Sequence, residues 1–419
     1  IDNKGMIGII RRTCNYVDAR LVDHGFRVAR MVSRLLERMG TCDTATARDI
    51  SILAMFHDIG AYKTEEINRM LEFETCNVQE HSVYGYLFIK YFTPLTRLAP
   101  AVLFHHTPWC ILENLEEVSE ENKTVAQLLN ITDRADVFME KEGGSFPDFL
   151  RQLQTDGGKK YCPRIAKLLM DADFAETMPI QEEGEEEFWE RIWNYPFSRE
   201  EIQKYLNMVI YTIDFRSRHT VTHTMTTTSI SYELAKRMGV TGQDLSDIYF
   251  GALLHDLGKI GIPVEILEFP GKLSPQAMRI MRTHVELTGR ILGQDVEEKI
   301  RKIALRHHEK LDGSGYPKGI PGAELTMGER IVAVADIVSA LAGTRSYKEA
   351  FPKERILSII ETMKADGLID RDAVDKIASD FDEIMEETAG RCQPILDMYH
   401  GIQAEYLQIE GYMAYIGNN

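Results

Sequence analysis

The sequence His255-Asp256-Leu257-Gly258-Lys259 opens a stretch that closes at Asp336 and decides the fold of the second half of the chain. Between these ends lie a single histidine, His284, and the pair His307-His308. Imidazole nitrogens and carboxylate oxygens are the ligands that proteins offer to divalent transition metals. A carboxylate next in sequence to a histidine ligand can also bridge two ions. The stretch therefore predicts a site for more than one divalent metal, with Lys259 placed to meet an anion.

The same pattern occurs earlier in the chain, which indicates an internal duplication. His57-Asp58 precedes His255-Asp256 by 198 residues, and His105-His106 precedes His307-His308 by 202 residues. Three further landmarks recur with offsets of 199, 203 and 203 residues, as His24 and His223, His81 and His284, and Asp133 and Asp336. Eleven of the twelve histidines fall in these two groups or directly beside them, leaving only His400. The duplication predicts two related domains, each with a candidate metal site.

Helical spacing of apolar residues predicts an all-α fold. Several segments have this period, among them 27–39, 46–57, 82–91 and 125–140. No series of alternating β-branched segments suggests a sheet. The acidic stretch 181–187 is the best candidate for a linker. We therefore expect tandem helical bundles, with an N-terminal domain at 1–185 and a second domain at 186–419.

Composition limits the classes of function. A formal charge of −17 argues against duplex nucleic acid or an anionic membrane as the main partner. The six cysteines form no CxxC pair and are read as reduced cytosolic thiols. The longest apolar run, 331–342, is too short for a bilayer, which takes about 20 residues. We expect a cytoplasmic protein. The sequence starts at Ile1, so the presence of a preceding sensor domain in a longer protein stays an open question.

The second copy resembles the HD-GYP family, the metal-dependent phosphodiesterases of the wider HD phosphohydrolase superfamily. Two motifs carry the resemblance, His255-Asp-Leu-Gly-Lys-Ile-Gly-Ile-Pro263 and His307-His-Glu-Lys-Leu-Asp-Gly-Ser-Gly-Tyr-Pro-Lys-Gly319. Both motifs are long and specific, and the resemblance runs from about Phe197 towards the end of the chain. The first copy is similar only to the general HD superfamily, because His105-His106 is followed by Thr-Pro-Trp-Cys and no GYP loop.

The resemblance implies a role for each matching residue. Asp256 would bridge the metals, and Lys259 would contact the scissile phosphate or the bridging hydroxide. Tyr316 and Gly315, in the 313–319 loop, would shape the substrate pocket. The implied metal ligands are His223, His255, Asp256, His284, His307, His308 and Asp336, and the implied phosphate-gripping pair is Arg345 and Lys348.

Metal number and identity stay partly open at this level. His219 stands where members of the family with three metals have a carboxylate, so it is a candidate ligand for a third ion. His219 and His223 would share one helical face. Two ions are the default expectation. The family favours iron or manganese, while zinc, nickel and cobalt also suit such ligands.

The first copy keeps the metal-type ligands but loses the cations. Its candidate site consists of His24, His57, Asp58, His81, His105, His106 and Asp133. Ala61 stands in place of Lys259, with Lys63 two residues later, and Glu142 and Ser145 stand in place of Arg345 and Lys348. Our hypothesis is that this copy is a regulatory, structural or differently specific module that does not cleave cyclic dinucleotides.

The function implied by the resemblance is metal-dependent hydrolysis of a cyclic dinucleotide, foremost cyclic di-GMP, to the linear dinucleotide and onward to GMP. A metal-bridging hydroxide would be the nucleophile. Cyclic GMP–AMP is the nearest rival substrate, and removal of phosphate from a nucleotide is another HD-type activity. The rival from a different class is a non-catalytic sensor that binds the dinucleotide and acts through a partner. A homodimer or a signalling partner is compatible with either reading.

Overall fold

The computed structural model describes residues 2–17, 19–62, 78–140, 144–171, 188, 190, 192, 197–214, 223–269, 271–343 and 351–418. Its elements in these ranges are all helices, and the β-type pairing found there is an isolated bridge between Gly157 and Tyr161. The predicted all-α class is therefore confirmed. None of the described helices combines the length and apolar character that a membrane crossing requires.

The described residues group into two compact units. The second-copy unit combines 206–400 with 1–17, and the first-copy unit combines 18–205 with 401–419. This grouping has its mid-chain boundary at 205/206, where we expected 185/186, and it assigns each end of the chain to the other unit than expected. Helix α1 (Asn3–Val17) joins the second-copy unit, where the Arg12 Nη1 atom lies 2.9 Å from Asp295 Oδ2. The end of the chain joins the first-copy unit, where Tyr406 stacks on Tyr84 with ring centroids 4.4 Å apart.

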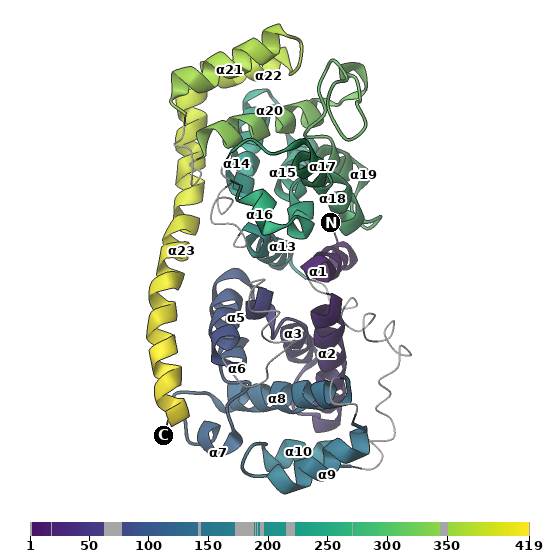
Figure 1. Ribbon diagram of the computed structural model, residues 1–419, viewed down its shortest axis with the longest axis vertical. Coiled ribbons are helices and arrows are strands. Elements are labelled where there is room, and N and C mark those ends of the chain that lie inside the picture. The colour runs from purple at the N-terminus through teal and green to yellow at the C-terminus, as the bar shows by residue number, and fades with distance from the viewer. Residues whose placement is uncertain are drawn as a thin grey trace. The chain divides into compact units, whose positions relative to one another are not determined.

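The second-copy unit is built around helices α14, α15 and α20 (Figure 1). Their buried faces share the aliphatic core that contains Ile230, Leu234, Ile331 and Val334. The elements of this unit after α1 are α13 (Arg199–Asp214, from residue 206), α14 (His223–Arg237), α15 (Gly242–Leu254), η3 (Leu257–Gly261), α16 (Val264–Leu267), α17 (Pro275–Arg282), α18 (His284–Leu292), α19 (Glu298–Leu305), η4 (Gly322–Glu324), α20 (Met327–Ala342), α21 (Lys353–Ala365), α22 (Arg371–Ser379) and α23 (Phe381–Asn418, up to residue 400).

The first-copy unit repeats the central arrangement. Helix α2 packs on α3 and α8 as α14 packs on α15 and α20, and η1 packs on α5 as η3 packs on α18. The duplication read from histidine spacing is thus also a duplication of packing. The elements of this unit are α2 (Ala19–Met39), α3 (Thr44–Met55), η1 (Ile59–Tyr62), α5 (Val78–Phe92), η2 (Thr96–Leu98), α6 (Ala99–Leu103), α7 (Trp109–Leu112), α8 (Glu120–Glu140), α9 (Phe146–Asp156), α10 (Pro163–Leu169) and the remaining parts of α13 and α23.

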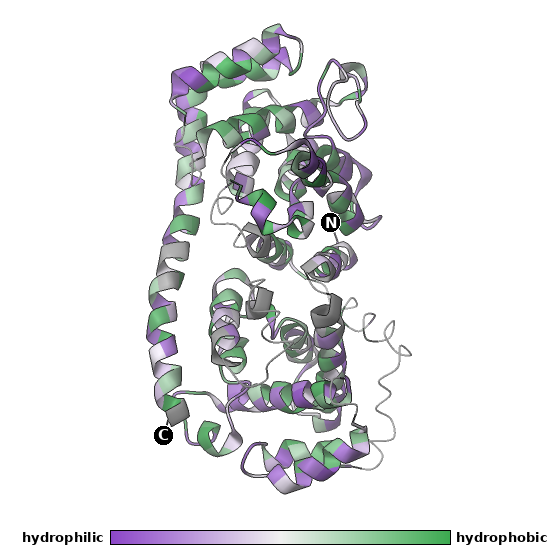
Figure 2. Ribbon diagram, viewed as in Figure 1, coloured by the Kyte–Doolittle hydropathy of each residue, from purple (hydrophilic) through white to green (hydrophobic). Residues whose placement is uncertain are grey.

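Helix α20 shows how local sequence sets an element that carries a site residue. Thr326 begins it with a capping box, in which the Thr326 N–H donates to Glu329 at 3.0 Å and the Glu329 N–H donates back to Thr326 at 3.4 Å. These bonds satisfy amides that the first helical turn leaves unpaired. The helix that follows is mostly hydrophobic (Figure 2). Asp336 is a buried carboxylate in its middle, which is costly unless the charge finds a partner.

Candidate metal centres

The predicted ligands of the second copy come together at the ends of four helices and the middle of a fifth. His223 begins α14, His255 follows the end of α15, and His284 begins α18. The pair His307-His308 follows α19. Asp336 enters from the middle of α20. Helix ends fix these side chains at defined points around one centre, although they are far apart in sequence.

Two carboxylates divide this cluster into two groups of donor atoms. Asp256 Oδ2 lies 3.1 Å from His255 Nε2 and 3.5 Å from His223 Nε2, whereas its Oδ1 lies 3.5 Å from His284 Nε2. Asp336 Oδ1 lies 3.1 Å from His223 Nε2, and its Oδ2 lies 3.7 Å from His308 Nδ1. Ligands on one ion with bonds of about 2.1 Å stand about 3 Å apart. Asp256, with histidine nitrogens facing both of its oxygens, would suit a bridge between two ions, and Asp336 likewise faces His223 and His308.

Backbone carbonyls fix which nitrogen of the histidines faces the centre. The Nδ1 atoms of His255, His284 and His307 lie 2.6, 2.7 and 2.7 Å from the carbonyl oxygens of Ala252, Met281 and Ala304, each three residues earlier. A carbonyl only accepts, so Nδ1 carries the proton and the Nε2 lone pair is left for a metal. His255 Nε2 and Asp256 Oδ1 are buried and make no hydrogen bond with the described residues. This donor set fits a divalent metal pair.

A glycine brings the His-Asp turn against the helix that begins with the next histidine. A Cβ on Gly258 would lie 1.9 Å from the His284 carbonyl oxygen and 2.5 Å from the Thr288 nitrogen. No side chain fits there, so glycine permits the close approach. The Gly258 N–H donates to the Thr288 hydroxyl at 2.9 Å. This contact sets how far His284 lies from Asp256.

The charges of the cluster are strongly coupled. Burial raises the pKa of Asp256, but the charges of His255 and Lys259 outweigh it and hold that pKa well below its usual range. Burial lowers the pKa of His255, yet Asp256 and Asp336 reverse this and raise it to about 10. Burial lowers the pKa of His308 to about 3 despite Asp336. Metals bind anionic carboxylates and neutral imidazoles, so a bound ion would displace the proton that His255 otherwise holds.

Lys259 and the loop with Tyr316 border the cluster. Lys259 Nζ donates to Asp256 Oδ2, so the predicted catalytic cation lies at the centre. Tyr316 contacts His308 with ring centroids 4.6 Å apart. Gly315 packs against its own chain, since a Cβ would lie 2.4 Å from the Lys310 nitrogen. The structure thus gives Gly315 a part in placing Tyr316.

Sequence reasoning missed a buried carboxylate that holds this loop. Glu309 is 3% exposed and accepts N–H bonds from Lys318 at 2.8 Å and from Ile320 at 2.9 Å. Its position directly after His307-His308 was visible in the motif, but no spacing rule connects it to amides nine and eleven residues later. Three further candidates, His219, Arg345 and Lys348, lie outside the described residues.

The first copy gathers the same residue types, with a different distribution around its first carboxylate. Asp58 Oδ2 lies 3.6 Å from His24 Nε2, while its Oδ1 lies 3.4 Å from His57 Nε2 and 3.7 Å from both His81 and His105 Nε2. The last carboxylate, Asp133, lies 3.2 Å from His24 Nε2 and 3.8 Å from His106 Nδ1. All seven predicted residues of this site are therefore brought together, in an arrangement able to hold metal ions.

Outside the shared ligands, the two clusters differ in what holds the first histidine. His24 Nδ1 lies 2.7 Å from Asp136 Oδ2, and the Arg27 guanidinium donates to both oxygens of Asp136 at 2.6 and 2.8 Å. His223 Nδ1 instead faces the Ser339 hydroxyl at 3.1 Å. A carboxylate behind a histidine fixes its tautomer and raises its basicity as a ligand. Asp136 was missed from sequence, although its place three residues after Asp133 put both on one helical face.

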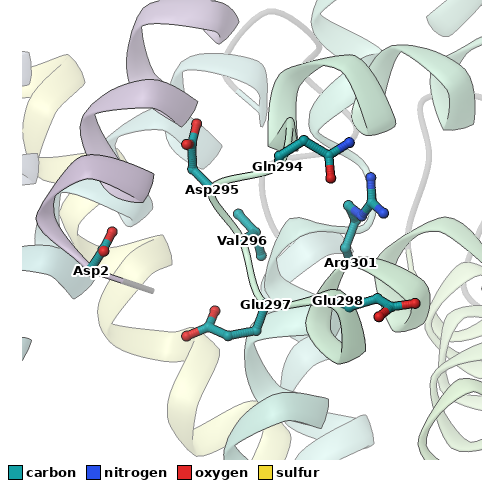
Figure 3. Close-up of a pocket in the computed structure, with 7 residues that line it drawn as sticks. All are labelled: Asp2, Gln294, Asp295, Val296, Glu297, Glu298 and Arg301. Atoms are coloured by element: carbon teal, nitrogen blue, oxygen red, sulfur yellow. The ribbon is translucent and has the colours of Figure 1, made fainter.

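A cavity of about 420 Å³ lies apart from the ligand residues of the second-copy unit (Figure 3). Its lining has four carboxylates and one guanidinium, and one carboxylate, Asp295, is already paired with Arg12. An anionic substrate would meet net repulsion there. The lining residues are Asp2, Gln294, Asp295, Val296, Glu297, Glu298 and Arg301.

Each of the two clusters lies in a segment of the chain that matches a protein-family model. The HD domain model matches residues 21–137, and a second model, also described as an HD domain, matches residues 207–373. A 3′3′-cGAMP-specific phosphodiesterase of Vibrio cholerae is 28% identical over 393 residues, covering 88% of this chain and 89% of that protein. A cyclic di-GMP phosphodiesterase of Thermotoga maritima is 37% identical over 187 residues, covering 44% of this chain and 49% of that protein.

Among solved structures, the crystal structure of a cyclic GMP–AMP-specific phosphodiesterase of V. cholerae has a similar fold. It matches with a TM-score of 0.52 and 17% sequence identity, covering 90% of this chain and 97% of that chain. At this identity the likeness concerns the fold. It agrees with the tandem helical arrangement described above.

Proposed function

We propose that this chain, which belongs to the HD-domain family and carries a second domain of HD-GYP type, hydrolyses a cyclic dinucleotide in its second-copy cluster. The observation that carries the proposal is the pair of carboxylates, Asp256 and Asp336, each facing histidines on two sides. That arrangement suits two ions, and Lys259 supplies a cation at the same centre. Phosphodiester hydrolysis is the class of chemistry that such a site performs.

Each side chain of the second-copy cluster has a role in the proposed hydrolysis. His223, His255, Asp256, His284, His307, His308 and Asp336 would hold the metals. Two divalent ions, iron or manganese by family preference, would activate a water and neutralise the phosphoryl oxygens. Lys259, freed from Asp256 by the ions, would donate to a phosphoryl oxygen as negative charge develops there. His219 stays a candidate ligand for a third ion, and Arg345 and Lys348 stay candidates for gripping the phosphate.

Cyclic di-GMP is the first candidate substrate. The supporting observation is the 37% identity between 187 residues of this chain and the T. maritima enzyme, which bears the name cyclic di-GMP phosphodiesterase. We expect the linear dinucleotide as product, with onward cleavage to GMP as a slower second step.

Cyclic GMP–AMP is the second candidate, favoured by a different observation. The V. cholerae relative named as specific for 3′3′-cGAMP aligns along 88% of this chain, which includes both copies. The described residues offer no contact that distinguishes guanine from adenine, so a substrate competition decides between the two.

We further propose that the first-copy cluster binds metal without cleaving cyclic dinucleotides. It gathers the same residue types as the second copy, but Ala61 replaces Lys259 in the sequence. A site without that cation gives less stabilisation to a phosphoryl transition state. A regulatory or structural role, or a substrate of another class, fits this composition. A homodimer, a signalling partner and a cytoplasmic location stay predictions.

The test is a hydrolysis assay on protein purified without oxygen and analysed for bound metal. Cyclic di-GMP and cyclic GMP–AMP are supplied separately, and Asp256→Ala serves as the control. We expect metal-dependent turnover that is lost in the control, with the faster substrate identifying the base preference. Metal-loaded protein that binds but does not turn over either dinucleotide would instead support the sensor.

A further inference from the structure

Arg282 lies beside the second-copy cluster without belonging to its ligand set. It is the last residue of α17, two positions before His284. Its guanidinium carbon lies 4.7 Å from the centroid of the Tyr316 ring, over that ring. Tyr316 in turn contacts the ligand candidate His308. A chain of two contacts thus connects an exposed arginine to the metal cluster.

The charge of Arg282 is available to a ligand. Helix α17 buries none of its residues, and Arg282 is exposed. Among the described residues it forms no ion pair and no hydrogen bond, whereas Lys259 is paired with Asp256. When a guanidinium stacks its flat face on an aromatic ring, the N–H groups at its edge are left free to donate hydrogen bonds.

Arg282 and the carboxylates of the cluster, Asp256 and Asp336, all act electrostatically on the Tyr316 hydroxyl. Burial and the charges of Asp256 and Asp336 raise the pKa of Tyr316, and Arg282 opposes them. The tyrosine ring therefore stands between the anionic centre and the exposed cation. An anion bound at the cluster and extending past Tyr316 would reach Arg282.

We infer that Arg282 binds the second, non-scissile phosphate of a cyclic dinucleotide, with Tyr316 holding its guanidinium in place. The inference rests on the proposed function. A cyclic dinucleotide has two phosphodiesters, so while one is cleaved the other remains an anion that needs a partner outside the metal ligands. An arginine fork matches two phosphate oxygens. At the offset of 203 residues that relates His81 to His284, the first copy has Gln79 in this position.

The experiment compares Arg282→Gln with Arg279→Gln, which removes an exposed arginine from the same helix and serves as the matched control. Each variant is assayed with a cyclic dinucleotide and with bis(4-nitrophenyl) phosphate, a diester with a single phosphate. For Arg282→Gln we expect kcat/KM on the cyclic dinucleotide to fall roughly tenfold to a hundredfold, mainly through KM, as for a lost hydrogen bond to a charged group. Turnover of the single-phosphate diester should not change.

Each other outcome has a definite meaning. Equal losses on both substrates would overturn the inference and show that Arg282 only positions Tyr316. No loss on either substrate would also overturn it. If the unaltered protein cleaves neither cyclic dinucleotide, the proposed hydrolysis fails, and calorimetric binding of cyclic di-GMP to unaltered and Arg282→Gln protein tests the contact by itself. Equal affinity, or no binding to either, would then reject the contact.

Discussion

The two candidate metal clusters gather the same residue types and have different surroundings. His24 Nε2 lies 3.2 Å from Asp133, and His223 Nε2 lies 3.1 Å from Asp336. Behind these histidines, however, the first copy has the Asp136–Arg27 pair and the second copy has the Ser339 hydroxyl. At the carboxylate of the second His-Asp pair, Lys259 donates to Asp256, whereas Ala61 stands at the matching position in the sequence of the first copy.

This contrast separates the side chains able to hold a metal from the cations that would meet an anionic substrate. In both copies a backbone carbonyl accepts from Nδ1 of the histidine in the His-Asp pair and of the first histidine in the His-His pair, which are His57 and His105 in the first copy and His255 and His307 in the second. The cations that an anionic substrate requires come from other positions, which can change without disturbing the ligands. A duplicated scaffold can therefore keep two metal sites and assign the chemistry to one of them.

The largest difference in turnover between the two copies is expected when the carboxylate of each His-Asp pair is removed in turn. For Asp256→Ala we expect cyclic dinucleotide turnover to fall more than about 100-fold, because even the partners behind metal ligands cost 10–100-fold when removed. Asp58→Ala should leave turnover close to that of the unaltered protein. Metal analysis of both variants checks that each lost only its own ions. Abolished turnover in Asp58→Ala would show that the first copy takes part in hydrolysis.

Removing the Lys259 cation tests whether its charge accounts for the expected activity of the second copy. For Lys259→Met we expect kcat to fall about 100-fold while bound metal stays constant, as when one donor to a developing negative charge is removed. Lys299→Met is the control, because Lys299 is an exposed lysine that pairs with Asp244 on the surface. A parallel loss of metal in Lys259→Met would mean that Lys259 supports the ligands instead.

The groups behind the first histidine should affect metal affinity unequally. For Asp136→Asn we expect the first-copy site to lose roughly 10–100-fold in affinity, since a carboxylate partner raises ligand basicity. Ser339→Ala should cost the second-copy site less, because a hydroxyl is a weaker partner. Each affinity is measured by metal titration after the other site is disabled, with Asp256→Ala or Asp58→Ala. Equal losses would show that the two partners are equivalent.

The smallest effect concerns the glycine that both copies use. A Cβ on Gly60 would lie 2.1 Å from the His81 carbonyl oxygen, as one on Gly258 would lie 1.9 Å from that of His284. Gly60→Ala and Gly258→Ala should each destabilise the affected unit by about 1–3 kcal/mol, the usual cost of overpacking. Gly261→Ala is the control, because the nearest atoms to its Cβ would be side-chain atoms of Leu287 and Tyr16 and not backbone. Thermal unfolding of the three variants tests this order.

Much of the site could be predicted from the sequence because metal chemistry restricts the residue types. Only a few side chains bind divalent metals, so histidines that recur with carboxylates at matching offsets identify both clusters. Asp136, Glu309 and Arg282 were not found in this way. A carboxylate behind a ligand, a buried loop anchor and an exposed arginine each look ordinary in sequence, and their roles follow from contacts across the fold.

The sequence by itself determined the all-helical class, the duplication and the two sets of histidines and carboxylates that come together. Helical periodicity and residue chemistry are local properties, so they can be read along the chain. The tertiary structure decided the orientations and the contact partners of the site residues. It turned both oxygens of Asp256 towards different histidines, put Asp136 or Ser339 behind the first histidine, and grouped α1 with the second-copy unit. These outcomes depend on packing between distant segments, which no local pattern encodes.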